Sequence, residues 1–344
     1  MRRKIAFVLV AVALLVLRVQ AQTDSVDDVC PAIVETALAS TDALCEGTGR
    51  NQVCYGNLRL NATPQDEAAA FSFDDVGDVI DVAQLAALRL SPMDVDVGEW
   101  GVALMRLQAN LPDTLPGQNV TFIMFGDVEI VNNVTGDMVT NEIMTPMQSF
   151  YLTTGIGDAR CREAPESGVL VQTPEGVGQI NLVVNEVEVQ LGSTALLQAE
   201  NKFDLNVTTL EGSAVLRDPT GRVYTVIAGT SFRIQIIPER TRIVPRMRLP
   251  ETYTADRVNP LPIDLLERDI EVRQPLNKDE LNTLYDRWEQ GEVLCGEFPF
   301  PPCDALPEAA GGTPCVLPNP DGTRPEGVSE DRPLCKVEET EAQD

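Results

Sequence analysis

The most restrictive feature of this sequence is the stretch from Val169 to Ile236, where apolar residues recur at every second position. A period of two puts alternate side chains on opposite faces of a strand, so each run buries one face. The runs predict strands with these buried side chains: Ile180, Leu182 and Val184; Val187, Val189 and Leu191; Ala195, Leu197 and Ala199; Phe203, Leu205 and Val207; Phe232, Ile234 and Ile236. The turn signals between them are Asn185-Glu186, Glu211-Gly212, Asp218-Pro219-Thr220-Gly221 and Ala228-Gly229-Thr230. Short strands separated in this way predict an antiparallel sandwich or rolled sheet.

Four motifs in this stretch resemble the FecR-like domain: TPEGVG, LGSTALLQA, VTTLEGSAVL and VIAGTSFRI, in that order. The domain takes its name from an iron-dicitrate signalling protein and occurs in secreted bacterial proteins. The resemblance implies an all-β extracytoplasmic domain used in sensing or protein contact. It carries over no catalytic residue.

Charge and composition exclude several classes of function. The net charge is −27 at pH 7, so the phosphates of a nucleic acid would be repelled. Such a charge suits an exported soluble protein or one that collects cations. The chain has no histidine, which excludes Ser-His-Asp and Cys-His catalysis and His-ligated zinc.

The first 21 residues are typical of a secretory signal peptide. Arg2, Arg3 and Lys4 precede an apolar run of 13 residues that ends at Leu17, too short for a span of about 20 residues. Cleavage is expected before Gln22. We therefore expect an extracytoplasmic protein, secreted or at the cell surface or periplasm, with no transmembrane span after cleavage.

All eight cysteines follow the expected cleavage site: Cys30, Cys45, Cys54, Cys161, Cys295, Cys303, Cys315 and Cys335. An even number of cysteines that follow a signal peptide predicts up to four disulfides, with about 105 possible pairings. The cysteines show no CxxC spacing and the chain has no histidine, which disfavours a metal site. We expect no metal and no other cofactor.

Helical spacing of apolar residues between Cys30 and Cys45 predicts a short amphipathic helix. A helix of that length places its ends about 21 Å apart, whereas bridged Cα atoms lie within about 7 Å. The helix therefore excludes a Cys30–Cys45 bond. Cys45 is predicted to pair with Cys54 across the short loop between them, which leaves Cys30 for Cys161. The four cysteines of the tail are expected to pair among themselves, most simply as Cys295–Cys303 and Cys315–Cys335.

A second β-rich block is predicted between Phe71 and Phe150. The segments WGVALMRLQANLP and NVTFIMFGDVEIVNN are apolar on both faces, which is typical of central strands. MQSFYLTTGIG predicts a further strand, whereas residues 79–90 fit either a helix or a strand.

Two acidic groups allow a different interpretation: Asp74, Asp75, Asp78 and Asp81, and Asp94, Asp96 and Glu99. Neither follows the calcium-loop spacing, and solvated loops are the simpler explanation. Paired carboxylates can hydrolyse glycosides, but only 5% of the residues are aromatic, which disfavours a sugar cleft.

After residue 238 the pattern changes. Arg240, Arg242, Arg246 and Arg248 form a basic strap, expected to lie across an acidic face of the same chain or, as the alternative, to bind a surface polymer. PIDLLERDIEV and NKDELNTLYDRWEQ predict two helices, the second beginning at Asn277. A Cys- and Pro-rich tail follows.

The resulting division is a signal peptide (1–21), a helix with a β-rich domain (22–165), a FecR-like β domain (166–238), a strap with helices (239–292) and a tail (293–344). The fold class is mainly β, with a short N-terminal helix and C-terminal helices. The sequence predicts a non-catalytic binding, sensing or structural module of the cell envelope. Its expected partner is a protein or another envelope component. The alternative is a carboxylate-based or calcium-dependent extracellular hydrolase.

Overall fold

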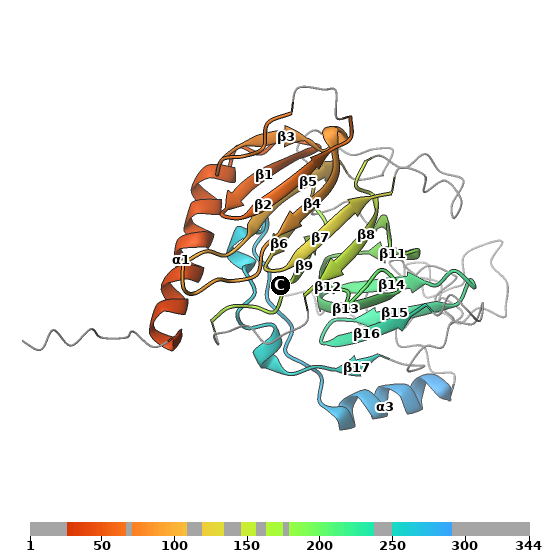
Figure 1. The fold of residues 1–344 in the computed structure, drawn as a ribbon. Helices are drawn as coiled ribbons and strands as arrows, with labels where there is room; N and C mark the ends of the chain where they lie inside the picture. Colours follow the sequence, from red (N-terminus) through yellow and green to blue (C-terminus); the bar gives the residue numbers. More distant parts are fainter. Residues whose placement is uncertain are drawn as a thin grey trace, which may run out of the picture.

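Two β-sheets lie face to face in this protein, with a long helix against the outside of one of them (Figure 1). The computed structural model describes residues 26–66, 71–108, 119–133, 146–155, 163–174, 179–236 and 250–290. The mainly β fold predicted from the alternating sequence pattern is therefore confirmed.

Within the described residues, sheet A has nine strands and sheet B has eight. Sheet A runs in the order β17 (Glu251–Thr252), β16 (Thr230–Gln235), β13 (Asp204–Glu211), β12 (Thr194–Gln198), β9 (Gly168–Gln172), β6 (Asn119–Phe125), β5 (Val102–Gln108), β1 (Gln52–Asn57) and β3 (Val79–Asp81). Sheet B runs in the order β15 (Val223–Ile227), β14 (Ser213–Arg217), β11 (Val187–Leu191), β10 (Ile180–Val184), β8 (Ser149–Thr154), β7 (Val128–Asn132), β4 (Leu85–Leu90) and β2 (Leu60–Pro64).

The strands of both sheets follow their order along the chain, apart from β3. Neighbouring strands are antiparallel except β8 and β10, which are parallel because the chain crosses to sheet A through β9 between them. The boundary predicted between residues 165 and 166 falls before β9. Both sheets continue across it, through the pairs β6–β9 and β8–β10. The division into two domains stays a prediction.

One apolar core fills the space between the sheets. It takes alternate residues from every long strand, as the period of two requires. The six side chains that best define the predicted register are all buried: Leu182, Val184, Val189, Leu191, Leu205 and Ile234. Phe203 is an error in that prediction, because its side chain is 37% exposed. Its N–H is bound by Asn201 Oδ1 at 2.9 Å, so this residue closes a turn before β13 begins.

Turns between strands lie where the sequence predicted them. Asn185 and Glu186 both have positive φ, 51° and 65°, as a two-residue turn between β10 and β11 requires. Gly212 (φ 67°) turns β13 into β14, and a Cβ there would lie 2.5 Å from the Cβ of Ser193. Asn185 is fully buried, and its amide bonds the N–H and the carbonyl of Leu152, so the turn is also fixed to β8.

A third layer covers part of the outer face of sheet A. Helix α1 (Val26–Cys45) contains the predicted helix and begins four residues before Cys30. The other component is residues 250–276, here called the cover segment, which contains the 3₁₀ turns η3 (Ala255–Arg257) and η4 (Ile263–Leu265). In Figure 1 this segment leads from β17 back towards α1.

The prediction of a helix over PIDLLERDIEV is wrong, because only η4 is helical there. The backbone N–H of Arg268 donates to Gln172 Oε1 at 3.0 Å, and its carbonyl accepts from Gln172 Nε2 at 2.7 Å. Sheet A thus takes the backbone groups that a helix would pair internally. Leu265 and Leu266 pack against the sheet instead.

Helix α3 (Lys278–Glu289) confirms the second C-terminal helix. Asn277 Oδ1 accepts from the N–H groups of Asp279 and Glu280, and Glu280 Oε2 accepts from the N–H of Asn277. This reciprocal arrangement is a capping box. The expected signal peptide, the four arginines at 240–248 and the tail after residue 292 lie outside the described residues.

Candidate functional site

A row of polar side chains crosses three neighbouring strands on the outer face of sheet A. Gln198 on β12 lies opposite Asn206 on β13, and Asn206 lies opposite Arg233 on β16. Their neighbours along the strands, Leu197 and Val207, point into the core. By the alternation of a strand, the row therefore points outward. We call this row together with Asp204 the pocket region.

Arg233 is held by two carboxylates. Its Nε and Nη2 donate to the two oxygens of Asp204 at 2.8 and 2.7 Å, and Nη2 lies 2.5 Å from Glu200 Oε1. The hydrogen bonds that Arg233 donates to Asp204 raise the pKa of the guanidinium above its ordinary value. Asp204 is 2% exposed, so its charge is compensated inside the protein by a bidentate arginine.

A second arginine reaches the row from the cover segment. Arg257, in η3, donates from Nη2 to Gln198 Oε1 at 2.7 Å, and its Nε lies 3.3 Å from Glu166 Oε2. Gln198 in turn donates from Nε2 to the carbonyl of Ser167 at 3.0 Å. These bonds give the Gln198 amide a single orientation.

The groups line a cavity of about 330 Å³ that is open to solvent on one side. Its floor is the pocket region, and its walls include Thr154 and Gly155 at the end of β8, Glu200 and Arg257. This volume is at the small end of the range for ligand pockets, about 300–1,000 Å³. The side chain of Asn206 lines the cavity and has no hydrogen-bond partner among the described residues.

The adjoining part of the same face is apolar and covered. We call it the covered region; its side chains are Trp100, Val102, Ile123, Phe125, Leu170 and Leu196. They are buried beneath Ile33, Val34 and Ala37 of α1 and Val258, Leu261 and Leu265 of the cover segment. The cavity therefore lies where this third layer ends.

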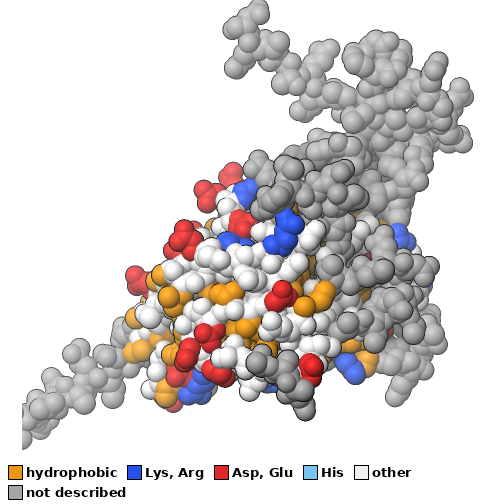
Figure 2. Space-filling view, turned by 90° about the horizontal axis from the view of Figure 1, so that it is seen from above, with side chains coloured by type: hydrophobic (Ala, Val, Ile, Leu, Met, Phe, Trp, Pro, Cys, Tyr) orange, Lys and Arg blue, Asp and Glu red, His pale blue; other side chains and the backbone are white. Residues whose placement is uncertain are grey.

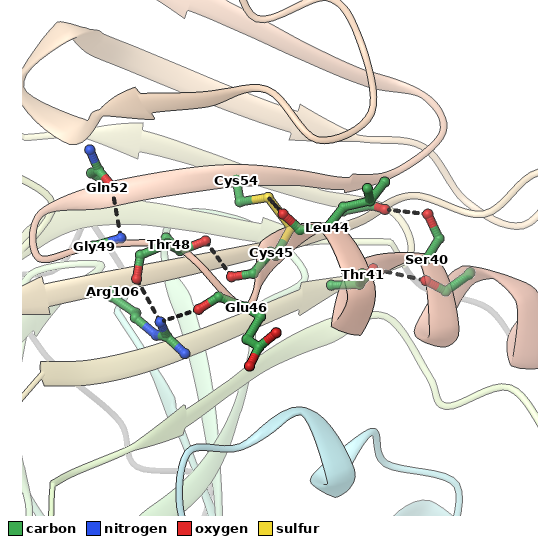
Figure 3. Close-up of a disulfide and its surroundings, with 12 residues drawn as sticks. Ser40, Thr41, Leu44, Cys45, Glu46, Thr48, Gly49, Gln52, Cys54 and Arg106 are labelled. Atoms are coloured by element: carbon green, nitrogen blue, oxygen red, sulfur yellow. Dashed lines mark hydrogen bonds between the residues drawn. A yellow bond between two sulfur atoms is a disulfide. The ribbon is translucent and has the colours of Figure 1, made fainter.

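A disulfide attaches α1 to sheet A. Cys45, the last residue of α1, is bonded to Cys54 on β1, as predicted (Figure 3). Arg106 from β5 donates to the carbonyls of Glu46 and Thr48 in the connecting turn. At Gly56 a Cβ would lie 2.5 Å from Thr41 Oγ1, so the glycine permits close contact between β1 and α1.

Of the other predicted disulfide residues, only Cys30 is described. Cys30 is also in a disulfide, and its partner lies outside the described residues. The pairing Cys30–Cys161 therefore stays a prediction. So do the pairs proposed for Cys295, Cys303, Cys315 and Cys335, none of which is described.

Two further ion pairs connect the cover segment to sheet A. Arg268 binds both oxygens of Glu211, at 3.1 and 2.5 Å. Burial alone would raise the pKa of Glu211, but hydrogen bonds from Arg268 and Ser193 outweigh it and hold the pKa below the ordinary value. Glu267 lies 2.8 Å from Arg106 Nε, yet burial exceeds this attraction and raises the pKa of Glu267.

The acidic groups singled out in the sequence stabilise turns. Asp78 Oδ2 accepts from the N–H groups of Asp74 and Asp75, and Asp81 Oδ1 accepts from the N–H of Ala83. Asp94 Oδ1 accepts from the N–H of Asp96. Glu99 pairs with Arg59. Within the part of the chain that the structure describes, no three Asp, Glu, His or Cys side chains are grouped as metal ligands.

Charge is not concentrated on the described surface seen in Figure 2. Acidic and basic side chains lie among apolar ones there, without a continuous basic patch. Neither helix of the described residues has the length and hydrophobicity of a membrane span.

The cavity was not predicted from the sequence, although the local sequence pattern indicates the positions of three of its lining residues. Gln198, Asn206 and Arg233 all occupy outward positions of predicted strands, next to predicted buried residues. Their pairing across the sheet follows from the register of β12 with β13, which are adjacent in the chain, and of β13 with β16, which are not. Glu166 and Arg257 come from distant parts of the chain, and no local pattern indicates their approach.

The chain was also compared with known proteins. No protein-family model, curated protein or solved structure matches it.

Proposed function

We propose that this protein is an extracytoplasmic, non-catalytic binding module, and that the cavity of the pocket region is where it binds. The observation that carries the proposal is a small cavity lined by fixed polar groups, one of which, the Asn206 amide, has no partner among the described residues. The signal-peptide pattern and the resemblance of residues 169–236 to FecR-like domains support export and a role at the cell envelope.

The state of the charged groups supports binding over catalysis. Both arginines of the cavity are engaged by carboxylates. General acid–base catalysis needs a group whose proton can move near the operating pH. A carboxylate that is fixed in an ion pair with arginine suits orientation of a ligand better than proton transfer.

Blocking the cavity tests the proposal. Substitution Asn206→Trp would fill it from the floor, whereas Gln190→Trp places the same side chain on the outer face of sheet B, at another half-buried mid-strand amide. We expect solubilised envelope material to be retained by immobilised wild-type protein and by the Gln190→Trp variant, and lost with Asn206→Trp. Equal retention by all three proteins would contradict the proposal, as would no retention by any.

The effect of calcium on the melting temperature distinguishes the proposed binding module from the alternative, a calcium-dependent hydrolase. A ligand that binds only the folded state raises the melting temperature, so a calcium-dependent enzyme would show a rise of several degrees at millimolar calcium. We expect the melting temperature of this protein to be unchanged by calcium.

A further inference from the structure

The chemistry of the cavity indicates which class of ligand it accepts, and this inference rests on the function proposed above. The cavity is lined by two guanidinium groups, Arg233 and Arg257, and three carboxylates, Glu166, Glu200 and Asp204. Arg233 is paired with Glu200 and Asp204, and Arg257 is paired with Glu166. The carboxylates outnumber the guanidinium groups, so an anionic ligand would meet a lining with an excess of negative charge and would compete with Asp204 and Glu200 for Arg233.

Hydrogen-bonding capacity remains after these pairs are made. Arg233 uses Nε and Nη2, and Arg257 uses the same two atoms, which leaves Nη1 of each guanidinium with two N–H donors. The Asn206 amide adds two donors and an acceptor between them. The cavity thus presents several donors beside carboxylate and amide acceptors, at fixed positions and without an excess of positive charge.

Hydroxyl groups match such a surface because each one donates and accepts a hydrogen bond. Adjacent hydroxyls on a sugar ring can bridge a donor and an acceptor that are held side by side, as Asn206 and Arg233 are across β13 and β16. The volume of about 330 Å³ is small, and suits one or two sugar rings. We propose that the pocket region binds an uncharged saccharide.

The lining also predicts how this binding behaves. The described residues that line the cavity include no aromatic side chain, so the ligand is held by hydrogen bonds without ring stacking. An uncharged ligand has no net attraction for salt to screen. Raising sodium chloride from about 0.05 to about 0.5 M should therefore change the dissociation constant by less than about twofold, whereas an anion would be released.

The test is a titration by calorimetry or protein NMR of the full chain with uncharged disaccharides, cellobiose and N,N′-diacetylchitobiose. The charged probes are glucuronic acid, glucosamine and inorganic phosphate. We expect at least one uncharged disaccharide to bind. Asn206→Ala should weaken the affinity for that disaccharide about tenfold, since loss of the hydrogen bonds of the side-chain amide corresponds to about 1.4 kcal/mol. The control Gln190→Ala should leave the affinity unchanged.

Each other outcome has a distinct meaning. If neither uncharged disaccharide binds in a way that depends on Asn206, the inference is wrong. If glucuronic acid, glucosamine or phosphate binds instead, and Asn206→Ala abolishes it, the saccharide inference fails while the proposed binding function stands. Because Asn206 is not part of an ion pair, an unchanged melting temperature of the alanine variant separates loss of binding from loss of folding.

Discussion

The covered region and the pocket region lie on one face of one sheet, and strand β12 contributes to both. Leu196 is in the covered region and is buried beneath the third layer, whereas Gln198, two residues further on, lines the cavity. On the inner face of the same strand, Ala195 and Leu197 lie in the apolar core. The inner face thus specifies the sandwich, and the outward side chains decide whether another layer covers it.

The largest effect is expected from the centre of the covered region. Phe125 is fully buried and contacts Trp100, with ring centroids 6.2 Å apart. Truncation by Phe125→Ala should reduce the free energy of unfolding by about 3–5 kcal/mol, as for other buried aromatic residues. Urea denaturation measures this. A loss below about 1 kcal/mol would mean that the third layer contributes little to stability.

Two substitutions on β12 compare the regions directly. Leu196→Ala should cost about 2–5 kcal/mol, because it leaves a cavity under the third layer. Gln198→Ala should cost about 1 kcal/mol, the net value of its hydrogen bonds to Arg257 and Ser167. Both variants are measured under the same denaturation conditions. Equal losses would show that the two regions do not differ in the way proposed.

Removing the disulfide loosens α1 from the sheet. The bond between Cys45 and Cys54 closes a loop with a sequence separation of 9. Its loss in the double variant Cys45→Ser, Cys54→Ser should cost about 2–3 kcal/mol through the greater freedom of the unfolded chain. Thermal melting measures the loss. Non-reducing peptide mapping of the wild type should recover Cys45 linked to Cys54, and any other partner for either residue would contradict the structure.

The smallest effects on stability are expected from the two ion pairs of the cover segment, which differ in how their contribution depends on pH. Glu211 has a lowered pKa when folded, so it stabilises the protein above its unfolded pKa, and that contribution is lost as pH falls through the folded value. Glu267 has a raised pKa, so its contribution is present at low pH and is lost as pH rises through the folded value.

Glutamine variants measure this contrast in stability curves across the acid range. Glu211→Gln should remove part of the fall in stability on acidification, and Glu267→Gln should remove a change of opposite sign. Each effect should be about 1 kcal/mol or less, because the side chains are partly exposed. Changes of the same sign in both variants would contradict the assignment.

Much of the fold follows from local pattern, because period-two alternation fixes which side of each strand is buried. The positions of the turns also follow from residue type, since asparagine and glycine favour the left-handed backbone found at Asn185 and Gly212. Residues 262–272 were misread because their leucines do contact the core, but as an extended segment whose backbone bonds Gln172. The cavity was missed because Arg257 and Glu166 meet only after the cover segment has folded over sheet A.

The order of the strands has a further consequence for how such a chain can change in evolution. Because each sheet is built in the sequence of the chain, apart from β3, added strands next to β15 in sheet B and next to β17 in sheet A would extend the two sheets without dividing an existing strand pair. Repeat proteins lengthen in the same way, since each unit contacts only its neighbours. The cavity floor occupies only β12, β13 and β16. This architecture can therefore vary in length while the three strands that carry its polar row are inherited unchanged.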